Sequence, residues 1–385
     1  MPDRPVRILH AHSTFDLGGK EARAVRLMNA WGERAEHVVL SATDRFGARE
    51  AIDAGIKVDF PTDAPSLVGK PAPGRYRRLS RYMRQFDLVL TYNWGAMDAV
   101  GARRLFGGPP LIHAEDGFNE DEAVRLNPKR NLFRRLMLPA AHRVVVPSQT
   151  LETVALNVWR QPERRVARIS NGIDLSQIDP AHPLPPPGFQ RVQGDVTIVT
   201  VAGLRKVKDL PFLVERVAIL NRSRPARLFI FGEGPERDAI AAKAAEHGIA
   251  DRVHLPGFVA EPSRYLAAFD IFALSSVSEQ FPISLVEAMA AGLPAISTDV
   301  GDVAGMVDTD NRSFVASQPG LYDSNLSALA ANEALRLQLG SANRRKALAI
   351  YDERVMISRY AALYGEAIGR PDAFVGAAAA VNSEV

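Results

Sequence analysis

The chain has 385 residues, of which 46% are hydrophobic, and 47 basic residues against 44 acidic ones give a formal net charge of +3. This length allows two or three soluble domains with cores of their own, and the absence of cysteine excludes disulfides, thiol nucleophiles and thiolate metal sites. No apolar run approaches the ~20 residues of a membrane-spanning helix, and a strand pattern at residues 6–10 stands where a signal peptide would lie, so we expect a cytoplasmic protein.

Short apolar runs alternate with helical patterns along the chain. The predicted strands are residues 6–12, 37–41, 87–92, 110–114, 143–147 and 168–171 in the first half, and 196–202, 227–232, 253–255, 270–275 and 294–298 in the second. Strands that alternate with helices predict an α/β fold with parallel, doubly wound sheets. Residues 182–188 are rich in proline, which cannot continue a helix or a central strand, so we expect a stiff linker there.

Two Rossmann-like domains follow from this pattern. We expect an N-terminal domain at residues 1–180, a linker at 181–194 and a C-terminal domain at 195–352. A last helix is expected at 353–370, and the alanine-rich tail at 371–385 is expected to be disordered.

Paired glycines follow the first predicted strand. Gly18 and Gly19 precede a helical pattern at residues 22–31. Glycine lets backbone approach a ligand closely, and the N-terminus of a helix favours an anion. A plain tight turn between a strand and a helix would use the same residues.

Polar residues follow two later strands of the first half. Asn93 and Trp94 come after the strand at 87–92, and His113 and Asp116 stand at the end of the strand at 110–114. Ligands bind at the carboxyl ends of parallel strands, so these four are candidate ligand contacts. His113 could donate to a ligand hydroxyl or to developing negative charge, or be structural, and Asp116 could instead cap a turn.

Basic residues and glycine turns follow the strands of the second half. Arg205 and Lys208 come after the strand at 196–202 and can neutralise a departing anion. Lys206 is a further candidate for this role. A solvated basic loop is the alternative. Further candidate contacts are the turn glycines Gly232 and Gly234, and Phe258 and Val259 after the strand at 253–255.

The stretch SSVSEQFPISLVEAMAAGLP at residues 275–294 is the most informative. It follows a strand, Pro282 suits the first position of a helix, and Gly292 with Pro294 marks the end of that helix. The backbone N–H groups at the helix start favour an anion such as a diphosphate.

Two carboxylates, Glu279 and Glu287, bracket this anion site. A carboxylate near a diphosphate is repelled unless it accepts hydrogen bonds from neutral hydroxyls, and the hydroxyls of a sugar and a ribose are such donors. The stretch therefore indicates recognition of a nucleotide-sugar. An ordinary core helix with two solvated glutamates is the alternative.

Two glutamates separated by seven residues, with Phe-Pro between them and Glu-Ala-Met-Ala-Ala-Gly-Leu-Pro at the end, resemble the signature of retaining GT-B glycosyltransferases of the family 4 type. The resemblance implies two Rossmann-like domains facing across a cleft, with the last helix crossing back to the first domain. It also implies that Glu287 holds the donor ribose and that Glu279 contacts the transferred sugar. Donor phosphate and sugar oxygens would lie at Gln280, Phe281, Pro282, Ile283 and Ser284.

The same resemblance implies roles for the other candidates. Gly18 and Gly19 resemble the family's Gly-Gly-x-Glu loop beside the donor diphosphate, and Arg205 and Lys208 its basic pair on that diphosphate. The turn at Gly232 and Gly234 would lie near the phosphate and the base, and Phe258 and Val259 would hold the base. His113 would contact the transferred sugar, although the usual His-Asp or His-Gly is replaced by His-Ala-Glu-Asp-Gly.

The expected reaction is transfer, with retention, from a UDP- or GDP-sugar. Arg205, Lys208 and the helix start can meet the charge of the leaving diphosphate, so we expect no metal and no other cofactor. The alternatives are a non-hydrolysing nucleotide-sugar epimerase, which would need no acceptor, and a catalytically silent nucleotide-sugar-binding protein.

The first half of the chain, which holds the acceptor-side candidates Asn93, Trp94 and Asp116, is basic. Residues 1–190 hold 27 lysines and arginines against 21 acids, and residues 75–84 contain five arginines and no acid. Residues 128–138 are basic and amphipathic, with apolar residues at helical spacing. Such segments suit an anionic membrane surface, so we expect a lipid-linked or saccharide acceptor of cell-surface glycan synthesis and peripheral contact with the inner face of the cell membrane. Nucleic acid is not expected, because no recognition motif accompanies the charge.

Overall fold

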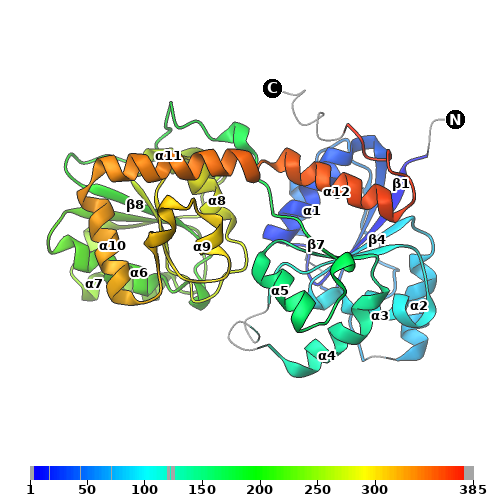
Figure 1. The fold of residues 1–385 in the computed structure, drawn as a ribbon. Coiled ribbons are helices and arrows are strands. Elements are labelled where there is room, and N and C mark those ends of the chain that lie inside the picture. Colours follow the sequence, from blue (N-terminus) through cyan, green and yellow to red (C-terminus); the bar gives the residue numbers. More distant parts are fainter. Residues whose placement is uncertain are drawn as a thin grey trace. The chain divides into compact units, whose positions relative to one another are not determined.

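The computed structural model describes residues 4–16, 18–43, 45–70, 72–118, 122 and 126–376. The chain divides into two compact units. Unit 1 comprises Met1–Asn171 and Arg354–Val385, and unit 2 comprises Gly172–Glu353. Each unit is an α/β layer structure around its own parallel sheet (Figure 1), as the sequence predicts.

Unit 1 contains a seven-stranded parallel sheet in the order β3-β2-β1-β4-β5-β6-β7. Its strands are β1 (Val6–His12), β2 (Ala35–Ser41), β3 (Val58–Asp59), β4 (Leu88–Tyr92), β5 (Leu111–Ala114), β6 (Arg143–Val146) and β7 (Val166–Arg168). The longer helices are α1 (Gly19–Trp31), α2 (Pro73–Met83), α3 (Met97–Phe106), α4 (Pro128–Met137), α5 (Gln149–Asn157) and α12 (Glu353–Ala367).

The two faces of this sheet are covered by different helices. Alternate residues of a strand point to opposite faces, so Ile8 packs with α1 and α12, while Leu9 packs with α2 and α3. Figure 1 shows α1 and α12 together, away from α2, α3 and α4. The last helix therefore belongs to unit 1, as expected.

Unit 2 contains a six-stranded parallel sheet in the order β10-β9-β8-β11-β12-β13. Its strands are β8 (Val196–Val201), β9 (Ala226–Phe231), β10 (Val253–Gly257), β11 (Ile271–Leu274), β12 (Ala295–Thr298) and β13 (Val315–Ala316). Its helices are α6 (Leu210–Asn221), α7 (Arg237–Glu246), α8 (Ile283–Ala290), α9 (Val303–Met306), α10 (Pro319–Ala331) and α11 (Glu333–Ile350).

Strand order reverses once in each sheet. In unit 1 the reversal falls between β1 and β4, and in unit 2 between β8 and β11. Loops that leave two neighbouring strands in opposite directions open a crevice at the carboxyl edge, where α/β sheets bind ligands. The candidate residues after β1 and β4, and those after β8 and β11, therefore stand at the two reversal points.

Several expectations about boundaries need correction. The strand predicted at 168–171 lies earlier, as β7, although Ile169 N–H still donates to the Val146 carbonyl at 3.0 Å. The two-residue strands β3 and β13 were not predicted, because two residues show no periodicity. The units divide after Asn171 rather than at residue 180, and residues 172–194 belong to unit 2.

The chain after residue 370 is also more ordered than expected. Phe374 has no exposed surface, and its ring lies 4.7 Å from that of Trp31, centroid to centroid. Burying an aromatic ring in the core of unit 1 stabilises the turn that carries it. The prediction of a disordered tail is therefore wrong for residues 371–376, and residues 377–385 lie outside the described part of the chain.

Candidate active site

The loops after β8 and β11 meet in unit 2 through a charged pair. Lys208, at the end of the short 3-10 helix Lys206–Lys208, donates to Oε1 of Glu279 at 2.5 Å. Ser276 Oγ donates to the same oxygen at 2.7 Å, and the side chains of Lys208 and Glu279 are only 18% and 11% exposed. The structure therefore brings together two residues that stand 71 positions apart in the sequence.

Backbone contacts hold this pair in place. Val277 N–H donates to the Val207 carbonyl at 2.9 Å, and Ser275 Oγ donates to the Lys208 carbonyl at 2.8 Å. Gly301 packs so closely that a Cβ atom would lie 2.1 Å from the Glu279 carbonyl oxygen. These three contacts fix the loop that carries Glu279, which preorganises its carboxylate.

Helix α8 begins at Ile283, two residues beyond Phe281 in the segment that carries Glu279 and Gln280. Pro282 is the residue before the helix, with φ −70° and ψ 105°, rather than its first residue as expected, and no side chain caps the helix start. Gly292 (φ +78°) ends it, with Leu293 N–H on the Ala288 carbonyl at 3.0 Å and Gly292 N–H on the Met289 carbonyl at 3.0 Å. The uncapped N-terminus leaves N–H groups available to an anion.

The remaining candidates of this edge differ in burial. Arg205 is exposed and forms no ion pair with another described residue, whereas Glu287 and Ser284 on α8 are half-buried. Gln280 Oε1 is buried and has no hydrogen-bond partner within the described part of the chain. A buried acceptor of this kind is costly unless a ligand or water satisfies it.

The glycine turns after β8 and β9 pack backbone against backbone. A Cβ atom on Gly232 would lie 2.0 Å from the Ala202 carbonyl oxygen, and one on Gly234 would lie 2.5 Å from that of Leu204. Leu204 N–H also donates to the Glu233 carbonyl at 2.9 Å. These close backbone contacts require glycine at both positions whether or not a donor binds there. A role of the two glycines in donor binding therefore remains a prediction.

An exposed aromatic ring follows β10. Phe258 is 71% exposed, and with the half-buried Val259 it borders a cavity of about 710 Å³ in unit 2. The cavity is lined mainly by aromatic and proline side chains, among them Phe229, Phe231 and Tyr265. An exposed phenyl ring beside an apolar cavity can stack on a planar ring such as a nucleotide base.

In unit 1, three polar side chains converge at the carboxyl edge. Asn93, which has φ +56°, accepts a hydrogen bond from Asp116 N–H at 2.7 Å. Arg23 on α1 binds the Asp116 carboxylate with both terminal nitrogens and donates to Asn171 Oδ1 at 2.9 Å. The structure thus joins the predicted Asn93 and Asp116 and shows that Asp116 is an ion-pair partner rather than a turn cap.

His113 does not stand at the edge. Its side chain has no exposed surface, and its ring nitrogens face Thr91 Oγ1 at 2.9 Å and Glu115 Oε2 at 3.4 Å. The expectation that His113 contacts a sugar is therefore not supported, because β5 turns this side chain into the layer beneath α3 and α4. The His-Ala-Glu-Asp-Gly departure from the family pattern was the sequence signal for this shift.

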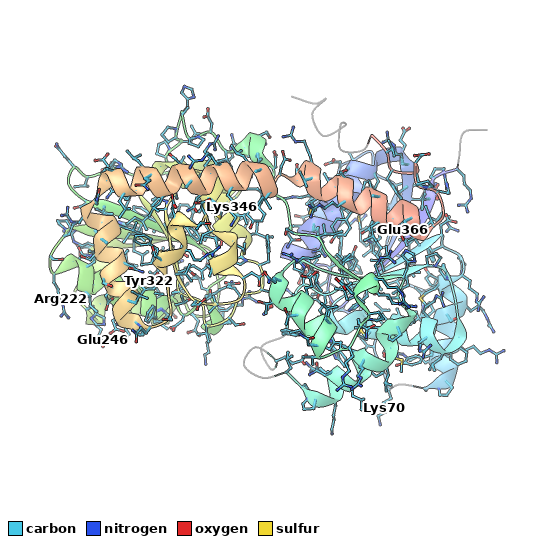
Figure 2. The ribbon with its side chains drawn as sticks, in the orientation of Figure 1. Lys70, Arg222, Glu246, Tyr322, Lys346 and Glu366 are labelled. Carbon is cyan, nitrogen blue, oxygen red and sulfur yellow. The ribbon has the colours of Figure 1, made fainter. Side chains whose placement is uncertain are left out.

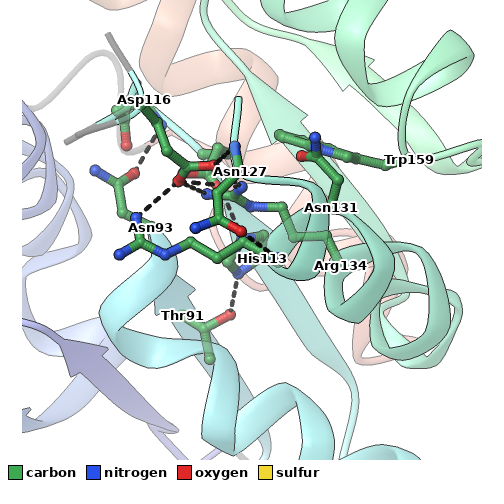
Figure 3. Close-up of polar contacts among 11 residues, drawn as sticks. Thr91, Asn93, His113, Asp116, Asn127, Asn131, Arg134 and Trp159 are labelled. Atoms are coloured by element: carbon green, nitrogen blue, oxygen red, sulfur yellow. Dashed lines mark hydrogen bonds and ion pairs between the residues drawn. The ribbon is translucent and has the colours of Figure 1, made fainter. Parts of the chain in front are cut away.

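A buried arginine lies at the centre of this layer (Figure 3). Arg134 on α4 is fully buried, donates to Glu115 Oε2 at 3.3 Å and to Glu122 Oε1 at 3.2 Å, and stacks against Trp94 and Trp159, each ring centroid 5.1 Å away. The half-buried Trp94 therefore packs on this arginine. Sequence reasoning named Trp94 but missed Arg134 with its two glutamates, because only folding brings these charges together.

The paired glycines begin α1 as predicted. Gly18 precedes the helix with φ −152° and no side-chain cap, and Gly19 is its first residue. Lys20 binds Glu21, and burial lowers the pKa of Lys20 to about 8, although Asp116 raises it. Beside them His12 is buried, and neither of its ring nitrogens has a hydrogen-bond partner among the described residues.

The basic helices are only partly exposed. Arg75 pairs with Asp98 at 2.6 Å and Arg130 with Glu122 at 3.0 Å, so these two and the buried Arg134 do not form a free charged surface. The basic and leucine side chains of α2 and α4 that do face solvent are Arg77, Arg78, Arg81, Lys129, Leu132, Arg135 and Leu136. Within the described ranges, no helix has the length and apolar character to cross a bilayer, and no group of three acidic or histidine side chains is arranged to hold a metal ion.

Two family models match this chain. The model described as glycosyltransferase family 4 matches residues 17–177, and the model described as glycosyl transferases group 1 matches residues 195–332. Together they span both reversal points described above.

Curated relatives are more distant. The chain is 28% identical over 175 residues to an N-acetyl-alpha-D-glucosaminyl L-malate synthase of Bacillus anthracis, a match that covers 45% of this chain and 46% of that protein. It is 26% identical over 304 residues to one subunit of the human phosphatidylinositol N-acetylglucosaminyltransferase, a match that covers 75% of this chain and 60% of that protein. The chain thus spans about half of the length of the curated relatives it matches.

Solved structures share the fold over nearly the whole chain. HepE of Anabaena, solved in complex with UDP, superposes with a TM-score of 0.75 at 18% identity and covers 94% of this chain and 100% of its own. With the two family models, this similarity establishes that the chain belongs to the group 1, family 4 glycosyltransferases and has their GT-B fold.

Proposed function

We propose that this protein is a retaining glycosyltransferase that moves a sugar from a nucleotide-diphosphate sugar to a lipid-linked, glycolipid or polysaccharide acceptor of a cell-surface glycan. One observation carries the proposal. The Lys208–Glu279 pair, Arg205 and the uncapped start of α8 all follow β8 and β11, the two strands at which the sheet of unit 2 reverses.

The donor diphosphate would lie at the start of α8. Backbone N–H groups of Ile283 and Ser284, together with Arg205 and Lys208, supply positive charge to it. Gln280 offers a buried, unsatisfied amide oxygen to a sugar hydroxyl. Glu287 would accept hydrogen bonds from the ribose hydroxyls, and the free oxygen of Glu279 would accept one from the transferred sugar.

The base would stack on Phe258, beside Val259 and the aromatic cavity. The solved HepE structure contains UDP, which favours a UDP-sugar over a GDP-sugar as the first donor to test. Both donors fit the anion site equally, because the site contacts the phosphates and ribose.

The acceptor would approach from unit 1. Asn93 and Asp116 meet at the carboxyl edge there, and Lys20 and Arg23 add positive charge beside them. The names of two relatives include L-malate and phosphatidylinositol, both of which carry hydroxyls and negative charge. An acceptor that combines a hydroxyl with an acidic group suits these residues.

In the transfer step, the bond between the anomeric carbon and the diphosphate oxygen breaks, and the acceptor oxygen bonds to the same carbon. The acceptor proton passes to the departing diphosphate, whose new charge Arg205, Lys208 and the α8 start stabilise. We propose that the acceptor attacks the face that the diphosphate leaves, which retains the configuration, and that no metal ion is required. We also propose that Glu279 acts as a hydrogen-bond acceptor and not as the nucleophile, with Lys208 and Ser276 positioning its carboxylate through Oε1.

Peripheral contact with an anionic membrane would bring a lipid-linked acceptor to unit 1. Helix α4 exposes Leu132 and Leu136, 57% and 53% exposed and one turn apart, together with the exposed Lys129 and Arg135. Exposed leucines flanked by basic residues suit a surface of anionic headgroups.

A transfer assay tests the proposal. Purified protein is incubated with a radiolabelled UDP- or GDP-sugar and a membrane extract, with and without a chelator. We expect label in the lipid or polysaccharide fraction in both conditions, and the same anomeric configuration in donor and product by NMR. Isomerised donor without transfer would indicate an epimerase instead, and donor binding without turnover would indicate a silent binding protein.

A further inference from the structure

Unit 1 contains a cavity on the side of its sheet away from the candidate active site. The cavity measures about 610 Å³ and lies at the amino ends of β5, β6 and β7. Its basic lining residues come from α3, from the start of β6 with the residue before it, and from the segment before β7; they are Arg103, Arg104, His142, Arg143, Arg164 and Arg165. The active-site candidates follow the carboxyl ends of β1, β4 and β5, at the opposite edge.

Positive charge in this cavity greatly exceeds negative charge. Its lining residues include no carboxylate. Glu366 on α12, labelled in Figure 2, contacts two of the basic residues, Arg143 at 2.8 Å and His142 at 3.5 Å, and is itself 54% exposed. Glu366 therefore offsets the charge of Arg143, and the like charges of the other four guanidinium groups favour a bound anion.

Backbone carbonyls fix two of the arginines. Arg103 Nε donates to the Pro109 carbonyl at 2.8 Å, and Arg165 donates to the carbonyls of Pro139 and Ala141. A guanidinium has five N–H donors, so each keeps N–H groups for a ligand after these bonds. The side chains are thus held at defined positions around the cavity rather than spread through solvent.

The other two arginines at the rim have no such contacts. Arg104 and Arg164 are exposed, and within the described ranges neither side chain forms an ion pair or a hydrogen bond. Solvation alone does not explain why they stand beside Arg103, Arg143 and Arg165. Exposed, unpaired arginines next to fixed ones are suited to close over a bound anion.

We propose that this cavity is a second anion site, separate from the donor site, and that it binds a phosphate-bearing ligand. Forked guanidinium groups match the oxygens of a phosphate, and several of them at once match a diphosphate or a triphosphate. The volume is large enough for such a group. The proposal does not rest on the glycosyltransferase function.

Two sources could supply the phosphate. One is a soluble phosphorylated metabolite, and the other is the headgroup of an anionic lipid. Leu105, which follows Arg104, is 57% exposed, and the cavity residues Pro139 and Ala140 continue directly from α4 and its exposed Leu136. These exposed leucines are near neighbours of lining residues in the chain, where the acyl chains of a lipid with its headgroup in the cavity would find apolar contacts.

Calorimetric titration of the full-length protein with inorganic triphosphate tests the site. The variant is Arg104→Gln with Arg164→Gln, because both side chains are exposed and unpaired and their loss should leave the fold intact. The matched control is Arg222→Gln with Arg224→Gln, which removes the same charge from an exposed segment of unit 2 (Arg222 is labelled in Figure 2). The donor site is intact in all three proteins, so its contribution cancels.

We expect the cavity variant to bind triphosphate at least tenfold more weakly than the wild type, with the control unchanged. Equal affinities in all three proteins, or an equal loss in both variants, would overturn the proposal. Sedimentation with phosphatidic acid vesicles identifies the source. Loss of vesicle binding by the cavity variant alone indicates a lipid headgroup, and loss of triphosphate binding with unchanged vesicle binding indicates a soluble ligand.

Discussion

Lys208 Nζ lies 2.5 Å from Glu279 Oε1, so residues from the loops of two neighbouring strands, β8 and β11, form one charged pair at the carboxyl edge of unit 2. Arg205 precedes this pair in the β8 loop, and α8 follows it after Pro282. Glu279 partly neutralises the charge of Lys208. Arg205, in contrast, is exposed and forms no ion pair with another described residue. This difference predicts that Arg205 carries more of the leaving-group charge.

The first prediction concerns Arg205. Arg205→Gln should lower kcat/KM for sugar transfer by about 10²- to 10³-fold, because it removes one preorganised donor to the developing diphosphate charge. Thermal unfolding should change little, since the side chain is exposed. The neighbouring exposed Lys206→Gln is the control, and a larger loss in that variant would reassign the basic role to Lys206.

The second prediction concerns the buried arginine of unit 1. Arg134→Met should destabilise the protein by roughly 3–5 kcal/mol, because it leaves the Glu115 carboxylate buried without its arginine and leaves Glu122 with Arg130 alone. Chemical denaturation monitored by Trp94 and Trp159 fluorescence measures this loss. Arg135→Met, on the exposed side of the same helix, is the control and should change stability by less than about 0.5 kcal/mol.

The third prediction concerns pH. His10, His12 and His37 are buried in unit 1, and burial lowers the pKa of each, that of His37 to about 4. The unfolded chain therefore binds protons that the folded chain does not, so stability is greatest above pH ~6.5 and falls as the pH decreases toward about 4. Melting temperatures should therefore be nearly constant from about pH 7.5 to about pH 6.5 and should fall between about pH 6.5 and about pH 4.5.

A substitution that removes the titratable imidazole identifies which histidine causes the decrease in melting temperature at low pH. His37 faces His10 Nε2 at 3.0 Å, and a glutamine there can still form a hydrogen bond. His37→Gln should therefore flatten the decrease in melting temperature below pH 6.5. His182→Gln, at an exposed histidine of unit 2, should leave it unchanged. An identical slope in all three proteins would assign the pH dependence to other groups.

The fourth prediction concerns the membrane. Replacing Leu132 and Leu136 of α4 by serine should reduce binding to anionic vesicles at low salt by about tenfold, because both exposed side chains would otherwise enter the interface. Vesicle sedimentation measures it, with Leu337→Ser and Leu348→Ser on the exposed side of α11 as the matched pair. If the α4 variant bound anionic vesicles as tightly as the wild type, the proposed membrane contact through α4 would be wrong.

The sequence predicted the sheets well because parallel strands carry continuous apolar runs. Strand β1 has the predicted bounds, and Gly292 ends α8 as expected. The errors arose where structure depends on distant partners. Phe374 orders the tail only because Trp31 and Tyr364 are there to pack against it, and the sequence around residue 374 does not show that contact.

The candidate site shows the same division. Glu279 and Lys208 were found because both follow apolar strands and carry charge. His113 is predicted to contact the transferred sugar, but its position in the sequence does not reveal which face of β5 it occupies, and the structure places it between Thr91 and Glu115. Arg23 was missed because it stands in an ordinary helical pattern, and its ion-pair partner Asp116 lies 93 residues later in the sequence.

The central claim is that unit 2 holds a nucleotide-sugar through α8, and donor binding by Glu287→Ala tests it most directly. Thermal shift and calorimetry are run with UDP-, GDP- and ADP-sugars on the wild type, on Glu287→Ala, and on Glu246→Ala, an exposed glutamate of α7 labelled in Figure 2. We expect one donor class to stabilise the wild type and the α7 control, with affinity weakened about tenfold to a hundredfold in Glu287→Ala, as the loss of a charged hydrogen-bond acceptor implies. A folded Glu287→Ala protein that binds this donor as tightly as the wild type would contradict the account.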